Sequence, residues 1–147
     1  MDFRGWFLEM SFKSSGALRY GPGIRAIVEV DQGIANYYRS LIPKYHYVQP
    51  QMYAAHITIV RTGKETPKNM ASWGKYEGEE IPFVYENQIH TDGNYWYLNV
   101  QSDRIGDIRE ELGLPRFRFG DRNYYHITIG NVKDAHRKSG EVSLQSD

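Results

Sequence analysis

The tetrapeptide His-Ile-Thr-Ile occurs twice in this chain, beginning at His56 and again at His126. The copies lie 70 positions apart (126 − 56) in a chain of 147 residues, one in each half. Alternating polar and β-branched residues are typical of a strand, in which residues two apart point to the same face. We therefore expect His56 and Thr58 to share one face of a strand, and His126 and Thr128 to share one face of another.

The first half is predicted to contain two strands, a helix and the first motif strand. An initial strand over 6–13 is expected to end at residues 14–16, where small residues gather. A β-branched run over 24–30 predicts a second strand. Asp31 can then cap a helix over 32–42, which a proline stops.

The second half predicts the same order after a polar connection over 61–78. Strands over 81–89 and 95–100 flank an Asp-Gly turn, which is typical of a hairpin. Asp103 can cap a helix over 104–112, followed by a glycine stop and then by the second motif strand.

Two similar halves therefore follow each other in one chain. The length suits a single domain over 1–147. Its polar tail, about 133–147, is expected to be loose or to add an edge strand over 141–144. The fold class that this layout favours is α+β, built by duplication.

Composition limits the classes of function. Eighteen basic and eighteen acidic residues give zero formal net charge, so any contact with a polyanion must be local. The chain has no cysteine, which excludes disulfides and cysteine-ligated zinc. With no signal-peptide pattern at the start and no long apolar run, we expect a cytoplasmic protein without membrane contact.

The two polar pairs suit phosphodiester chemistry at a ribose. If the halves are related by a rough two-fold axis, the pairs face each other. One imidazole would remove a proton from water or a 2′-hydroxyl, and the other would protonate the departing oxygen. The two threonine hydroxyls would stabilise charge on the phosphate.

These residues resemble the paired signature of the 2H phosphoesterase superfamily, in which each half carries His-hydrophobic-Thr/Ser-hydrophobic. That superfamily includes LigT-like RNA phosphodiesterases, cyclic-phosphate hydrolases and viral enzymes that degrade nucleotide messengers. The resemblance covers roughly residues 24–132 by layout. It implies a two-lobed, pseudo-symmetric fold whose antiparallel sheets line a central cleft with helices outside. It also implies metal-independent chemistry in which His56, Thr58, His126 and Thr128 are catalytic.

One position in each motif departs from the family pattern. Many members have proline immediately before the motif histidine, whereas this chain has Ala55 and Tyr125. This departure affects the assignment to a subfamily and leaves the histidine–threonine chemistry intact.

Basic and aromatic residues near the motifs are candidates for substrate binding. Arg118 and Arg122 lie in an alternating basic-aromatic stretch before the second motif, where guanidinium groups suit phosphate. Tyr53 and Tyr124 precede the two motifs and could stack on a base or form a hydrogen bond to a phosphate. Tyr20 is expected in a loop over the site. The competing interpretation of each is ordinary packing or surface exposure.

The other histidines give no sign of a metal site. His46 and His90 are expected in loops or at the surface, and His136 in the tail. No His-x-His or His-Glu-x-x-His pattern or dense carboxylate cluster accompanies them, so no metal or other cofactor is expected.

The sequence thus predicts a phosphodiesterase acting on a 2′,3′-cyclic phosphate, a 2′-5′ oligonucleotide or a cyclic oligonucleotide messenger. The expected partner is a nucleotide or short oligonucleotide, with no protein partner implied. Alternatives are a 2′-5′ RNA ligase, a nucleotide-binding or sequestering protein without turnover, and a structural domain with coincidental motifs. The sequence leaves open which histidine is the acid and which the base.

Overall fold

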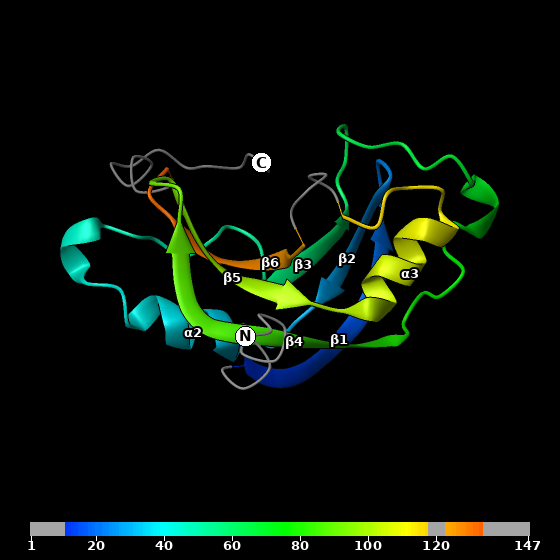
Figure 1. Ribbon diagram of the computed structural model, residues 1–147. Helices are drawn as coiled ribbons and strands as arrows, with labels where there is room; N and C mark the ends of the chain where they lie inside the picture. The colour runs from blue at the N-terminus through cyan, green and yellow to red at the C-terminus, as the bar shows by residue number, and fades with distance from the viewer. Residues whose placement is uncertain (1–10, 118–122, 134–147) are drawn as a thin grey trace.

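The structure is a computed structural model that describes residues 11–117 and 123–133 (Figure 1). Within these ranges six antiparallel strands form a closed barrel in the order β1-β2-β3-β6-β5-β4. The strands are β1 (Ser11–Gly21), β2 (Arg25–Glu29), β3 (His56–Val60), β4 (Glu80–Thr91), β5 (Tyr95–Gln101) and β6 (Tyr125–Asn131). The α-helices of the described part are α2 (Gln32–Ser40) and α3 (Asp103–Glu111), with short 3-10 turns at Lys44–His46 and Met70–Ser72. None of these helices is long and apolar enough to cross a membrane.

The first strand differs from its prediction, because β1 continues through Gly16 to Gly21 instead of ending at residues 14–16. A side chain at Gly16 would place its Cβ 2.0 Å from the backbone oxygen of Glu29, so only glycine fits there. β1 pairs with β4 up to Ala17 and with β2 from Ala17 onward. The glycine therefore marks where β1 passes from one partner strand to the next.

Both helices begin at side-chain caps. Asp31 caps α2 as predicted, since its Oδ1 accepts a hydrogen bond of 2.9 Å from the backbone N–H of Gly33. The prediction for α3 was wrong by one residue: Ser102 is the cap, and its Oγ accepts from the N–H of Ile105. Asp103 is the first helical residue, and its carboxylate is stabilised there by the positive end of the helix dipole.

The predicted hairpin joins β4 to β5. Asp92 holds the turn, because its Oδ1 accepts from the backbone N–H groups of Asn94 and Tyr95 at 2.9 and 2.8 Å. Gly93 has a φ of 97°, a conformation that favours glycine. The polar connection before this hairpin is a loop with one short 3-10 turn, also as predicted.

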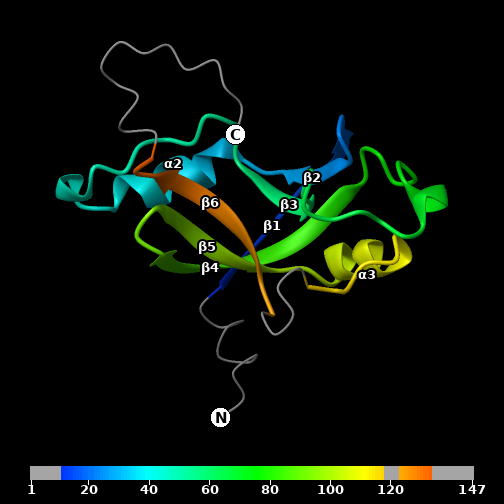
Figure 2. The same cartoon turned by 90° about the horizontal axis from the view of Figure 1, so that it is seen from above.

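Side chains alternate between an apolar face and a polar face along the motif strands. The motif histidines and threonines are half-buried. The four motif isoleucines are fully buried: Ile57, Ile59, Ile127 and Ile129. Both helices contribute to the same core, α2 through Ala35 and Tyr38 and α3 through Ile105 and Ile108. The helices lie at opposite ends of the sheet (Figures 1 and 2). The motif histidines and threonines lie on the other face of their strands, which is turned away from this core.

The strand pairings of the first half recur in the second half at residue numbers that are 70 higher. β2 pairs with β3 through Ile27–Thr58, Val28–Ile57 and Glu29–His56, and β5 pairs with β6 through Tyr97–Thr128, Leu98–Ile127 and Asn99–His126. Each residue of the second set lies 70 positions after its counterpart in the first (for example 98 − 28). The architecture confirms a mixed α and β fold with an antiparallel sheet.

Candidate functional site

The two motif strands are neighbours in the barrel. Ile57 of β3 pairs with Ile127 of β6, and the pair is antiparallel. In such a pair the residues that flank a matched position also oppose each other. The flanking motif residues then form two polar pairs across the strands, His56 with Thr128 and Thr58 with His126. Each histidine therefore lies beside the threonine of the other half, on the face opposite the core.

The His56 ring has a defined orientation. Its Nδ1 lies 2.8 Å from the backbone oxygen of Ala54, and because a carbonyl only accepts, Nδ1 carries the hydrogen. The neutral ring then presents the unprotonated Nε2. Burial lowers the pKa of His56, and the nearby Arg25 charge lowers it further, against the opposing hydrogen bond to Ala54. His56 is therefore neutral at pH 7, as a general base must be.

An aromatic side chain contacts the second histidine. The rings of Tyr97 and His126 have centroids 5.6 Å apart and are inclined by 60°. The ring of Tyr97 also stacks on His90 of β4, with centroids 5.6 Å apart at 23°. Tyr97 is also the residue that pairs with Thr128. These contacts restrict where the His126 ring can lie.

His90 extends this polar face away from the motifs. Its Nε2 forms a hydrogen bond with the carboxylate of Glu86, a residue that is only 8% exposed. The amide nitrogen of Asn99 lies 3.3 Å from the same ring nitrogen, and Asn99 pairs with His126. The prediction of His90 in a loop or on the surface was wrong, because it lies half-buried in β4. An i, i+4 spacing from Glu86 was the only trace of this pair in the sequence.

One arginine from each helix anchors the motif strand of the other half. Arg109 of α3 donates from Nη1 to the backbone oxygen of Ile59 at 2.6 Å. Arg39 of α2 donates from Nη1 to the backbone oxygen of Ile129 at 2.9 Å. Donors and acceptors again differ by 70 positions (109 − 39 and 129 − 59). Both motif strands are therefore held at equivalent carbonyls.

Arg109 is the more deeply buried of these two arginines. Its side chain is fully buried and forms two hydrogen bonds to the carboxylate of Glu65, at 2.7 and 3.1 Å. Its Nε donates to the backbone oxygen of Pro115 at 2.8 Å. A single guanidinium thus ties the loop after β3 and the loop after α3 to the end of the first motif strand.

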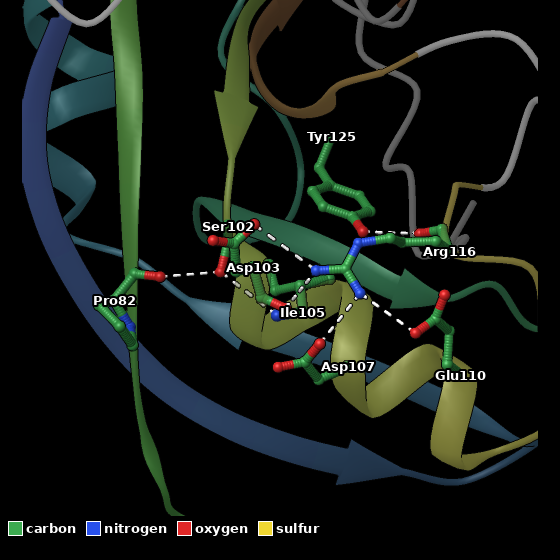
Figure 3. A network of polar contacts seen from close by, with 8 residues as sticks. All are labelled: Pro82, Ser102, Asp103, Ile105, Asp107, Glu110, Arg116 and Tyr125. Atoms are coloured by element: carbon green, nitrogen blue, oxygen red, sulfur yellow. Dashed lines mark hydrogen bonds and ion pairs between the residues drawn. The ribbon is translucent and has the colours of Figure 1, made fainter. Parts of the chain in front are cut away.

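The start of the second motif strand is fixed by Tyr125. Its hydroxyl donates to the backbone oxygen of Arg116 at 2.6 Å (Figure 3). Its ring packs on Phe117. Burial raises the pKa of Tyr125 to about 12, so the hydroxyl keeps its proton. As its alternation with His126 predicts, Tyr125 points into the core instead of onto the polar face.

Arg25 is a functional candidate that the sequence reasoning missed. Alternation along β2 puts Arg25 on the same face as Ile27 and Glu29, which lie opposite Thr58 and His56. Its guanidinium makes no hydrogen bond or ion pair with another described residue, and its charge acts on His56. The shared alternation with the motif strand is the signal that could have identified it.

The structure brings some predicted binding residues near the motifs and not others. Tyr124 precedes β6 and Tyr53 precedes β3, and their side chains are 37% and 39% exposed. Tyr20 lies in strand β1 instead of a loop, and its ring packs edge-on against Trp73. It belongs to the face that carries Leu18, away from the histidines. Arg118 and Arg122 lie outside the described residues.

Comparisons with known proteins do not identify a family. No protein-family model, curated protein sequence or solved structure matches this chain. Within residues 11–117 and 123–133, no three histidine, aspartate or glutamate side chains are grouped as they are in metal sites. The functional argument therefore rests on the geometry of the described residues.

Proposed function

We propose that this protein is a phosphodiesterase that cleaves a ribose phosphodiester or cyclic phosphate by general acid and base catalysis with two histidines, without a metal. The observation that carries this proposal is the Ile57–Ile127 pair, because it brings both His-x-Thr motifs onto one face of adjacent strands. Pure ligand binding does not require two imidazoles and two hydroxyls in this arrangement.

His56 is the general base of the first step. Its Nε2 takes the proton of a water or a ribose 2′-hydroxyl, and that oxygen forms a bond to phosphorus. The bond between phosphorus and the departing oxygen breaks, and His126 in its protonated form gives that oxygen a proton. The assignment is supported by the hydrogen on Nδ1 of His56 and by the lowered pKa of that ring.

The threonines hold the phosphate. Their hydroxyls donate to the two non-bridging oxygens, where negative charge builds up in the transition state. Thr128 serves the side of the phosphate next to His56, and Thr58 serves the side next to His126. Arg25, on the same face, adds a positive charge for the phosphate.

The fold of this enzyme is a duplicated one, with two halves related by a pseudo-two-fold axis through the β3–β6 pair. Two kinds of contact repeat with the same shift of 70 and support this, the strand pairings and the helix arginines, and Ile57 and Ile127, which are equivalent residues of the two halves, pair with each other. We propose that each half is a lobe and that the polar face between them is the substrate cleft.

The experiment is a turnover assay in EDTA on 2′,3′-cyclic nucleotides, 2′-5′ oligoadenylates and cyclic di- and trinucleotides. Wild type is expected to cleave one class, and His126→Ala to lose that activity. His46→Ala is the matched control, because His46 is exposed and lies outside the motif strands. Loss of turnover on addition of EDTA would contradict the metal-free mechanism. Saturable binding without cleavage would identify a sequestering protein, and joining of 2′-5′ ends would identify a ligase.

A further inference from the structure

A hollow of about 430 Å³ lies next to the start of the second motif strand. Its lining comes from the end of β5, the start of α3 and residues 116–117 and 123–124, and includes Gln101, Asp103, Arg116, Phe117, Asn123 and Tyr124. Its volume falls in the range of small-molecule sites. We call this hollow the α3 pocket.

The α3 pocket continues the polar face of the histidines. Tyr124 lies two residues before His126, and Gln101 lies two residues after Asn99, the residue that pairs with His126. In β5, Asn99 and Gln101 share a face, and residues two apart along an extended chain lie about 7 Å apart. A nucleotide whose phosphate contacts His126 therefore has its base within reach of the pocket.

Among the described residues, the charges around the pocket disfavour a phosphate as its occupant. Arg116 donates to Asp107 at 2.9 Å and to Glu110 at 3.2 Å, and to the backbone oxygen of Asp103 at 3.0 Å (Figure 3). The carboxylate of Asp103 lies 3.5 Å from the same guanidinium. Three carboxylates thus surround one positive charge, and a further anion would be repelled.

The remaining lining suits a flat, uncharged group with polar edges. Tyr124 offers an exposed ring for stacking. The amides of Gln101 and Asn123 each carry donors and an acceptor, and within the described residues neither amide has a hydrogen-bond partner. Nucleobases have a π-face and edges with donors and acceptors, which matches this combination.

We propose that the α3 pocket binds the base of the substrate nucleotide, with Tyr124 stacking on the base and Gln101 and Asn123 contacting its edge. This inference rests on the proposed function for the identity of the substrate. It also makes this pocket the place where one base is distinguished from another.

The test measures binding separately from turnover. Wild-type protein is titrated with adenosine, guanosine, cytidine, uridine and, as the base-free probe, 1-O-methylribose, while NMR follows the side-chain amides of Gln101 and Asn123. We expect saturable shifts of these amide signals with at least one nucleoside and none with 1-O-methylribose. Tyr124→Leu is expected to weaken nucleoside binding roughly tenfold, and Tyr124→Phe to retain it.

Tyr45→Leu is the control for a lost exposed tyrosine, since Tyr45 is 72% exposed and lies beyond α2. It should bind nucleosides as wild type does. If no nucleoside shifts the two amides, or if Tyr124→Leu and Tyr45→Leu behave alike, the pocket assignment is wrong. Nucleoside binding in a protein that cleaves nothing would overturn the proposed function alone, and cleavage without pocket shifts would overturn this inference alone.

Discussion

Ile57 and Ile127 lie directly opposite each other where the two motif strands pair. They are equivalent positions of the two His-Ile-Thr-Ile copies, so the centre of the pairing coincides with the centre of the repeat. Two identical tetrapeptides that met in any other register would not place each histidine beside the threonine of the other copy. The pairing thus accounts for why both copies keep histidine and threonine at the same spacing.

The activity is expected to fall at acid pH through protonation of His56. Burial lowers the pKa of His56 below its ordinary value, about 6.5, so the acid limb of kcat/KM should have its midpoint below that pH. The Arg25 charge contributes to this lowering. Arg25→Gln should raise the pKa of His56 and move the acid limb to higher pH, as followed by NMR titration of the His56 ring.

Protein stability should follow the same titration. The pKa of His56 is lower in the folded state than in the unfolded chain, so its contribution is complete above about pH 6.5 and is lost as pH falls through the folded pKa. If Arg25→Gln left the acid limb of kcat/KM at the wild-type pH, the electrostatic link between Arg25 and His56 would be contradicted.

The buried Arg109 should matter more for stability than an exposed ion pair. Arg109→Leu leaves the Glu65 carboxylate and the Ile59 carbonyl without this donor, and should lower the free energy of unfolding by about 3–5 kcal/mol. Arg19→Leu is the control: it breaks ion pairs with Glu29 and Glu77, all three side chains being about half exposed, and should change the free energy of unfolding far less. Urea unfolding measures both variants, and equal losses would refute the role of burial.

The threonine hydroxyls should matter for catalysis and not for folding. Thr58→Val and Thr128→Val keep the shape of the side chain but remove the donor to the phosphate. Each should lower kcat/KM by about 10²-fold with little change in the unfolding midpoint. Thr66→Val, on an exposed loop position, should leave kcat/KM as it is. Variants at 58 and 128 that retain full activity would leave the threonines without the proposed role.

Tyr97 is expected to position His126 through its ring. Tyr97→Ala removes the ring contact with His126 and His90, and should lower kcat by roughly tenfold with a smaller change in KM. Tyr97→Phe keeps the ring and should keep most of kcat. If Tyr97→Phe lost as much as Tyr97→Ala, the phenol oxygen and not the ring would be the important group.

Local signals predicted most of the strands and helices. The Asp31 cap and the Asp-Gly hairpin turn were found because each is decided by a few adjacent residues. The error at β1 had a different origin. Gly16 resembles a strand end in sequence, but its role is to let the backbone of Glu29 approach, which only the tertiary fold reveals.

The site shows the same division between local and distant contacts. His56 and His126 could be found because they lie in a repeated motif. Arg109 carries no such signal, since its partners Glu65 and Ile59 are 44 and 50 positions away. The pairing of β3 with β6, on which the proposed chemistry depends, was likewise a hypothesis until the strand order was known.

The central claim is that His56 and His126 act on one phosphate. The most direct test measures kcat of His56→Ala, His126→Ala and the double variant on the best substrate of the panel, with EDTA present. Each single variant should lose about 10³-fold, and the double variant should lose little more than either single one, because the two rings work as a unit. Full turnover in either single variant, or losses that multiply in the double variant, would contradict the claim.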